Sequence, residues 1–413
     1  REFFVFTAAT GLAILHVLDD AFIGKQPGTT SGDHLLAAGA LLVVLGGSLA
    51  LYPRLRPGAR AALAVVLGIL ITTAGAMHVA HAVVDEAERS DITGMLALIG
   101  GVALIVLGLV VAWRAPAPAS WKRRWGKRVA IAASGLLVGF YVVVPIAIAI
   151  YVTHTPREPI DGTFSVPHED VSFETADGLT LRGWYAPSRN GAAVVLAHGS
   201  GGSRLGPREH ARLLAEHGYG VLLYDARGAA ESDGDPMGFD WTWQPDVDAA
   251  VEYLKSRPDV REGRIGGLGL SSGAESLVEA AGRREDVRAV VAEGAGLRTY
   301  GDLLDLPGAD SWITLPNTAV MLAAAQVLAG WPDVRSVGDF VGAGRPDRVL
   351  LIAAGKGVGA EDQLNALWAE RAGGRVQLWE LPEGKHTGAL AEEPKEYERR
   401  VIGFFDRRLL GRS

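Results

Sequence analysis

The sequence predicts two domains of different fold class, an α-helical transmembrane domain and an α/β domain with a mostly parallel sheet. Residues 1–152 contain five long apolar stretches, and a proline-containing linker follows at 153–167. Beyond it, at 168–413, short β-rich runs alternate with helical stretches. The chain has 413 residues, 48% of them apolar, and a single core rarely exceeds ~250–300 residues. The length therefore accommodates both domains.

The apolar stretches have the length of membrane spans. Each is close to the ~20 residues that cross a ~30 Å hydrocarbon layer as a helix. A cleavable signal peptide supplies one short apolar core rather than five, and the helices of a soluble bundle carry a polar stripe that these stretches lack. The sequence thus predicts five transmembrane helices, at residues 3–23, 34–52, 61–84, 92–113 and 129–152.

Charges in the connecting loops predict the orientation. The loops at 53–60 and 114–128 are rich in Lys and Arg and contain no acid, whereas those at 24–33 and 85–91 together contain five acidic residues and two basic ones. By the positive-inside rule the basic loops are cytoplasmic. With five spans, we expect a multi-pass protein of the cell membrane, in contact with membrane lipid, whose C-terminal domain is extracytoplasmic.

Ionisable residues within the predicted spans form a candidate metal site. His16 and Asp20 lie toward the end of the first span, and His78 and His81 close the third with Asp85 one turn further on. Such residues usually face a bundle interior or a water-filled cavity. Imidazoles and carboxylates bind divalent metals such as zinc. The alternative is that these groups are hydrated at helix ends and hydrogen-bonded between helices.

Composition excludes several classes of function. The chain has no cysteine, which excludes a thiolate nucleophile, disulfides and Cys-ligated metal sites. Its formal net charge of −7 argues against a nucleic-acid partner, because such proteins usually concentrate basic residues on one surface.

The second domain shows eight candidate strands and helical stretches between them. This alternation favours a mostly parallel eight-stranded sheet covered by helices. The predicted strands are residues 171–175, 180–186, 192–197, 220–224, 264–270, 287–292, 348–353 and 375–381.

A sharp strand–turn–helix motif provides a candidate nucleophile. Residues 269–273 read Gly-Leu-Ser-Ser-Gly between a strand-like and a helix-like run. Small flanking residues let strand and helix approach closely, so that the Ser271 hydroxyl is exposed at the sheet edge. Upstream, a glycine-rich turn at 198–203 offers the backbone N–H of Ser200, which together with that of Ser272 would form an oxyanion hole. The alternative, a phosphate-binding loop, lacks the Lys-Ser or Lys-Thr that closes one.

One histidine follows this motif in the chain. His386 comes after the last predicted strand, whereas the other histidines of the second domain precede Ser271. An imidazole near pKa ~6.5 accepts a serine proton readily. His386 is therefore the candidate general base.

These motifs resemble those of the α/β-hydrolase superfamily, especially bacterial hydrolases related to dienelactone hydrolase and the prolyl-peptidase-like esterases. The resemblance runs from residue 165 to residue 410. It implies an α/β-hydrolase sheet with a helical cap, and structural roles for Asp225 and Arg227 beneath the site. The matching pieces are Leu-Ala-His-Gly-Ser-Gly-Gly at 196–202, Tyr-Asp-Ala-Arg-Gly at 224–228, Glu-Ser-Asp-Gly at 231–234, the Ser271 motif and His386.

The acid of the triad departs from the family pattern. The seventh strand is usually followed by Gly-x-x-Asp, but here no carboxylate stands at that offset. Glu361, or the adjacent Asp362, would reach His386 through a longer loop. Glu293, which ends an otherwise apolar strand, is the alternative, since a buried carboxylate needs a partner.

An apolar cap is expected at 297–344, where it would line a pocket for a hydrophobic group. The resemblance implies a serine hydrolase that cleaves ester, thioester or amide bonds through an acyl-enzyme. The predicted spans add a membrane anchor, and the apolar cap favours a lipophilic small molecule or lipid as the substrate. This serine chemistry requires no cofactor. Two alternatives stay open: a catalytically weak, hydrolase-like ligand-binding or sensor protein, and a metal-dependent site at the membrane His and Asp residues. The sequence predicts neither the substrate nor the oligomeric state.

Overall fold

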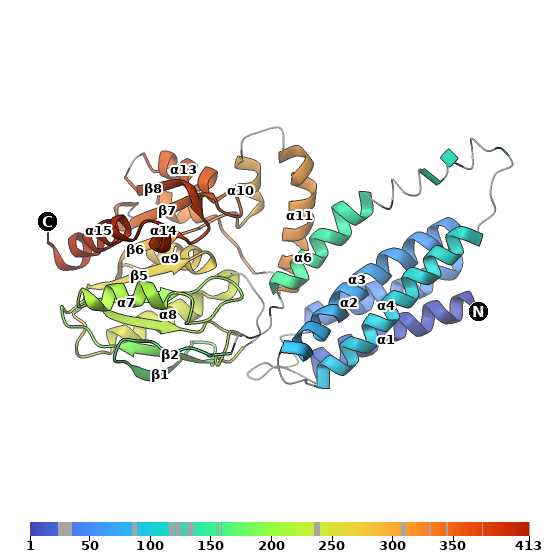
Figure 1. Cartoon of the computed structure of the whole chain (residues 1–413), viewed down its shortest axis with the longest axis horizontal. Helices are drawn as coiled ribbons and strands as arrows, with labels where there is room; N and C mark the ends of the chain where they lie inside the picture. Colours follow the sequence, from blue (N-terminus) through green and yellow to red (C-terminus); the bar gives the residue numbers. More distant parts are fainter. Residues whose placement is uncertain are drawn as a thin grey trace. The chain divides into compact units, whose positions relative to one another are not determined.

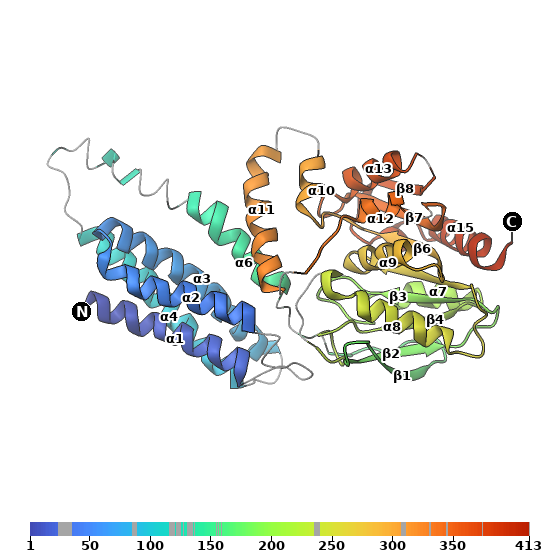
Figure 2. The same ribbon diagram turned by 180° about the vertical axis from the view of Figure 1, so that it is seen from behind.

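The computed structural model divides into two compact units (Figures 1 and 2). The helical unit comprises Arg1–Thr153 and Trp312–Trp331, and the sheet unit comprises His154–Ser311 and Pro332–Ser413. The middle of the predicted cap thus groups with the N-terminal helices. The structure describes the chain except for residues 24–34, 85–88, 115–119, 121–124, 127, 130–134, 136, 154, 156, 158, 235–239, 307–310, 330–331, 344–345, 374 and 413.

Glycines allow two helices of the helical unit to pack closely. A Cβ on Gly68 of α3 would lie 2.7 Å from the Gly101 carbonyl oxygen of α4, and one on Gly101 would lie 2.8 Å from that of Gly68. Small residues at such contacts bring helix backbones together. The elements of this unit are α1 (Glu2–Phe22), α2 (Leu35–Leu51), η1 (Tyr52–Arg54), α3 (Pro57–Val84), α4 (Arg89–Arg114), the π-helical turn η2 (Gly139–Val143), α6 (Val144–Thr153) and most of α11 (Ser311–Leu328).

The prediction of five membrane spans is not supported. Helices form in all five predicted stretches, but among the described residues two segments, Glu2–Phe22 and Ile92–Arg114, are long and apolar enough to cross a membrane. The apolar parts of the other helices are 10–17 residues long, shorter than the ~20 that a bilayer requires. Two such helices are weak support for a membrane protein, because buried core helices share their length and composition.

The metal site predicted in the helical unit is likewise unsupported. Among the residues that the structure describes, no three His, Asp or Glu side chains lie close enough to hold an ion. The Nδ1 of His16 lies 3.2 Å from Thr93 Oγ1, which donates to Asp19 Oδ2 at 3.0 Å. These residues therefore link α1 to α4. Asp20 is half-buried on α1; the side chains of His78 and His81, and all of Asp85, lie outside the described residues.

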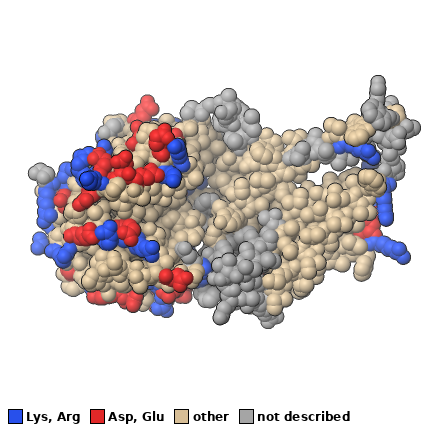
Figure 3. Space-filling model, in the orientation of Figure 1, with Lys and Arg blue, Asp and Glu red and all other residues tan. Residues whose placement is uncertain are grey.

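The surface of the two units differs in charge. On the face drawn in Figure 3, Lys, Arg, Asp and Glu gather over the sheet unit, whereas the helical unit presents mostly other residues. Phe4, Val43 and Trp113 are 75%, 74% and 84% exposed. The helical unit therefore carries large apolar side chains on its surface.

The sheet has eight strands, as predicted, but it is mixed rather than mostly parallel. Strand β2 runs antiparallel to both of its neighbours, β1 and β4, while the remaining pairs are parallel. The short turn at 175–179 explains the first pair, since parallel strands need a longer crossover. In spatial order the strands are β1 (Glu169–Glu174), β2 (Thr180–Ala186), β4 (Gly220–Tyr224), β3 (Ala193–Ala197), β5 (Ile265–Leu270), β6 (Val287–Glu293), β7 (Val349–Lys356) and β8 (Gln377–Lys385).

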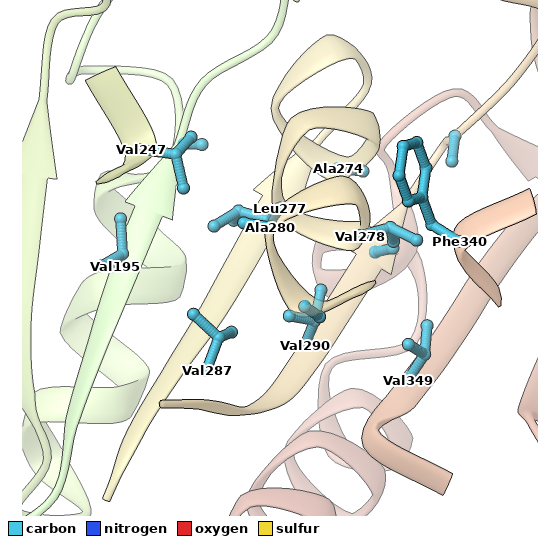
Figure 4. Packing of buried hydrophobic residues seen from close by; sticks show 14 of the residues in the cluster. Val195, Val247, Ala274, Leu277, Val278, Ala280, Val287, Val290, Phe340 and Val349 are labelled. Carbon is cyan, nitrogen blue, oxygen red and sulfur yellow. The ribbon is translucent and has the colours of Figure 1, made fainter. Parts of the chain in front are cut away.

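Helices cover both faces of the sheet. Figure 4 shows Leu277, Val278 and Ala280 of α9 close to Val287 and Val290 of β6. One face packs against α8 (Gln244–Lys255), α9 (Ser272–Arg283), α12 (Val337–Ala343) and α13 (Glu361–Arg371), and the other against α7 (Arg208–Glu216) and α15 (Pro394–Phe405). The shorter elements are η3 (Asp240–Thr242), α10 (Tyr300–Asp305), η4 (Pro346–Arg348), α14 (Ala389–Glu392) and the π-helical turn η5 (Asp406–Leu410).

Burial on both faces explains the sequence of the central strands. Every residue of β3 and β4 is buried, so these strands are continuous apolar runs rather than alternating ones. The carboxyl ends of β3, β5, β6 and β7 meet at one edge of the sheet, and the loops that follow them carry the predicted site residues.

Candidate active site

Ser271 occupies a strained turn between β5 and α9. Its φ of 52° and ψ of −123° are unfavourable for a residue with a side chain, and such strain is typical of functional positions. The turn needs the flanking glycines, because a Cβ on Gly269 would lie 2.2 Å from the Gly273 carbonyl oxygen. The geometry is that of a nucleophile elbow.

The glycine-rich turn after β3 packs against this elbow. A Cβ on Gly199 would lie 3.2 Å from Ser271 Cβ, and one on Gly273 would lie 2.4 Å from the Ala197 carbonyl oxygen. Ser200 follows Gly199 and is exposed, whereas Ser272 is buried as the first residue of α9. The two predicted oxyanion donors thus belong to adjoining turns.

The structure pairs His386 with Glu361. His386 Nδ1 is hydrogen-bonded to Glu361 Oε2, and the histidine side chain is 25% exposed while that of the glutamate is 1% exposed. The carboxylate also accepts the Ala354 N–H at 2.8 Å and the Val358 N–H at 3.4 Å. A buried acid thus orients an accessible imidazole.

The elbow and the histidine lie at the same strand ends. Leu270 is paired with Glu293 in the sheet, and the Ser271 N–H donates to the Glu293 carbonyl oxygen at 2.8 Å. A Cβ on the next residue, Gly294, would lie 2.9 Å from His386 Cε1. Serine, histidine and carboxylate therefore occur in the chain order and at the strand ends that a hydrolase triad requires.

Comparisons with known proteins agree with this architecture. The family model of the X-Pro dipeptidyl-peptidases (S15 family) matches residues 154–333. An esterase of Pyrococcus furiosus superposes with a TM-score of 0.51 at 22% identity, over 62% of this chain and 97% of that one. The sheet unit has the α/β-hydrolase fold.

Curated relatives of this chain match over shorter regions. The uncharacterized protein YfhR of Escherichia coli is 30% identical over 163 residues, 38% of this chain and 57% of that protein. The polyketide transferase grgF of a Penicillium species is 36% identical over 140 residues, 31% of this chain and 45% of that protein. The chain thus spans about half the length of these relatives.

Two residues that the sequence analysis did not identify hold Glu361 in place. Gly357 leaves room for the acid, because a Cβ there would lie 2.1 Å from Glu361 Cδ. Asn365 is fully buried, and its Nδ2 donates to the carbonyl oxygens of Ala295 and Glu361, each at 2.6 Å. In the sequence, the alternating glycines at 355–359 were the one signal that the loop before Glu361 is unusual.

Glu293, the alternative acid, has a different partner. It is 2% exposed and its Oε1 accepts the Ala389 N–H at 2.9 Å. Its Oε2 lies 3.6 Å from Nε2 of the buried His210, beyond hydrogen-bond distance. Glu293 and Glu361 line the same small hollow. The geometry therefore favours Glu361 as the partner of the histidine.

His198 fixes the glycine-rich turn. Its Nδ1 is 2.7 Å from the Gly199 carbonyl oxygen, and its Nε2 accepts the Ala226 N–H at 3.0 Å. One ring nitrogen donates and the other accepts, so the imidazole is neutral. Burial lowers the pKa of His198 to about 4.

Asp225 and Arg227 hold loops beneath the site, as the resemblance implied. Asp225 is buried and accepts the backbone N–H of Arg204 at 2.8 Å. Arg227 donates through Nε and Nη2 to the buried Asp246, at 2.8 and 2.6 Å, and through Nη1 to Asp177. These ion pairs connect the end of β4 to α8 and to the β1–β2 turn.

Proposed function

We propose that the sheet unit is a serine hydrolase that cleaves carboxylic esters. The observation that carries this proposal is the His386–Glu361 pair beside a strained serine elbow. Ser271 is the nucleophile, His386 the general base and Glu361 the group that orients the imidazole. The pairing supports an active enzyme over the alternative of a catalytically weak ligand-binding protein, because Glu361 supplies the acid that is missing at the usual offset.

The proposed reaction has two stages. Ser271 Oγ attacks the ester carbonyl carbon as His386 Nε2 takes its proton, and the backbone N–H groups of Ser200 and Ser272 stabilise the oxyanion. The tetrahedral intermediate breaks its bond to the alcohol oxygen, which takes the proton from His386 and leaves an acyl-enzyme. Water then attacks the acyl carbon while His386 accepts its proton. That proton returns to Ser271 as the carboxylic acid departs.

Covalent labelling tests this proposal. A fluorophosphonate should label Ser271, with the adduct located by mass spectrometry, and p-nitrophenyl esters should be hydrolysed with a burst. Ser271→Ala should abolish labelling and reduce kcat at least about 10³-fold. Glu380→Gln, at an exposed position on β8, is the control. A Ser271→Ala protein that hydrolyses esters like the wild type would overturn the proposal.

We propose further that the substrate is lipophilic. Tyr300 and Leu304 on α10, and Val358 in the turn before α13, are large apolar side chains with 39%, 72% and 58% exposure. The Leu297 N–H, just before α10, donates to the Gly359 carbonyl oxygen at 2.9 Å, so these segments adjoin. Exposed apolar side chains beside the turn that leads to Glu361 support an apolar acyl or alkyl group in the substrate.

A further inference from the structure

Glu293 is hydrogen-bonded both to Ser271 and to the end of the histidine loop, residues 386–389. Its backbone carbonyl oxygen accepts the Ser271 N–H at 2.8 Å, and its side chain accepts the Ala389 N–H at 2.9 Å. Ala389 is three residues beyond His386 and begins α14. One residue at the end of β6 thus bonds to the nucleophile elbow on one side and to the histidine loop on the other.

The residue after Glu293 completes this connection. Gly294 has φ +79°, and a Cβ there would lie 2.9 Å from His386 Cε1 and 3.1 Å from Nδ1. Its N–H donates to the Ile352 carbonyl oxygen of β7 at 3.0 Å. The imidazole therefore rests directly on the backbone that follows β6. Thr387, with φ of 50°, shows that the histidine loop is itself strained.

The surroundings of the Glu293 carboxylate restrict its motion. His210 on α7 and Tyr397 on α15 are both buried, and their rings lie edge to face with centroids 5.4 Å apart. His210 Nε2 faces Oε2 of Glu293 at 3.6 Å. Burial and then the Glu293 carboxylate raise the pKa of Tyr397 well above its usual range, so the phenol keeps its proton. With Ala389 of α14, three different elements thus surround a carboxylate that is costly to bury.

We propose that Glu293 is a positioning residue, which joins the Ser271 elbow to the His386 loop through its carbonyl and carboxylate oxygens. This inference rests on the proposed function, because it assigns a role in the same site. Glu293 does not orient the imidazole by contact, as Glu361 does. It holds the loop that carries the imidazole, and misplacement of a catalytic group by about 1 Å lowers rates up to about 100-fold.

Substitutions at Glu293 separate this role from that of a catalytic acid. Glu293→Gln keeps an oxygen that accepts the Ala389 N–H, so kcat should stay within about threefold of wild type. Glu293→Leu removes the acceptor and should lower kcat about 10- to 100-fold, with KM within about twofold. Glu380→Leu controls for the exchange of Glu for Leu at an exposed site. Glu293→Asp, which keeps the charge but shortens the side chain, should also lower kcat. It takes the place of Glu293→Leu in the test if the Leu variant does not fold.

Two readouts separate the contact made by Glu293 from the contact made by Glu361. Hydrogen exchange at Ala389 should accelerate in Glu293→Leu and Glu293→Asp, but not in Glu293→Gln or Glu361→Gln. The downfield proton NMR signal of His386 Nδ1–H should persist in Glu293→Gln and disappear in Glu361→Gln. A Glu293→Gln variant with the activity loss and altered pH profile of Glu361→Gln would overturn the proposal, as would unchanged kcat in both Glu293→Leu and Glu293→Asp.

The exchange measurement also separates the two proposals. If Ser271 is not labelled by fluorophosphonate in the wild type, the proposed function fails, yet exchange at Ala389 still reports whether Glu293 holds the loop. If labelling succeeds while exchange at Ala389 is the same in all Glu293 variants, the positioning role fails and the proposed hydrolase stands.

Discussion

Single residues determine whether the acid reaches the histidine. Glu361 is the first residue of α13, and it follows Ala360, which has a left-handed φ of 55°. Its carboxylate turns back over Gly357 to meet His386 and the Ala354 N–H. The position of the acid thus depends on a residue with a positive φ and on one without a side chain.

Gly357→Ala should displace this acid. The new methyl group would lie 2.1 Å from Glu361 Cδ, so either the carboxylate or the turn must move. We expect kcat to fall about 10- to 100-fold with little change in KM, because the imidazole loses its orienting partner. Ester hydrolysis measures this. Gly403→Ala on α15, where a methyl group would meet only the end of the Arg407 side chain, is the matched control. Equal kcat in the two variants would contradict the prediction.

His198 should make stability depend on pH. Its pKa in the folded chain is about 4, below the ordinary 6.5, so the unfolded chain binds more protons between these values. The contribution of neutral His198 to the free energy of unfolding is fully present above pH 6.5. It is lost as the pH falls toward 4, by about 3 kcal/mol in all. Asp225 has the opposite effect on the pH dependence of stability, since burial raises its pKa to about 6.

Comparison with a variant isolates the histidine contribution. Urea unfolding at pH 7 and pH 5 should show a larger loss of stability for the wild type than for His198→Asn, which has no titrating group at this position. Equal losses in the two proteins would show that His198 is not the group responsible.

At the scale of elements, the sequence predicted strands better than it predicted their connections. The predicted strands at 192–197 and 264–270 match Ala193–Ala197 and Ile265–Leu270 closely, because burial on both faces leaves a continuous apolar run. The short turn at 175–179 encodes the antiparallel pairing of β1 with β2, but no local pattern encodes the pairing of β2 with β4.

The choice between two acids was equally inaccessible from the sequence. Glu293 ends one buried strand and Glu361 stands in the segment after another, and the local pattern does not favour either glutamate. The structure distinguishes them through contacts between distant segments: Asn365 with Ala295, and Ala389 with Glu293. The Ser271 elbow was predictable because small residues around a serine are a local signal. His386 was predictable from its position in the chain after Ser271.

The turn before α13 and helix α10 should determine acyl-chain preference. If Val358, Tyr300 and Leu304 contact the substrate, kcat/KM for p-nitrophenyl esters should rise from acetate to octanoate, each buried CH₂ contributing up to ~0.8 kcal/mol. Val358→Ser should reduce this rise but leave acetate hydrolysis unchanged, since the Val358 N–H that bonds Glu361 is retained. The ratio of octanoate to acetate kcat/KM is the measurement. The same ratio in variant and wild type would exclude Val358 from the acyl site.

At the scale of the whole molecule, we propose that the helical unit attaches the hydrolase to a membrane. Phe4, Val43 and Trp113 are exposed, and two described helices are long and apolar enough to span a bilayer. A soluble unit would instead surround its apolar core with a polar surface. The extracytoplasmic orientation of the active site stays a prediction, because it requires a further span between the basic loop at 114–128 and the sheet unit.

Membrane attachment predicts how the full chain fractionates in cells. It should sediment with membranes, resist extraction by alkaline carbonate and high salt, and dissolve in detergent with its esterase activity retained, because apolar contact with lipid does not depend on charge. An extracytoplasmic active site should also be labelled in intact cells by a charged, membrane-impermeant fluorophosphonate. Release by carbonate would contradict insertion of the helices. Labelling only after cell lysis would place the active site on the cytoplasmic side and reverse the proposed orientation, while leaving attachment intact.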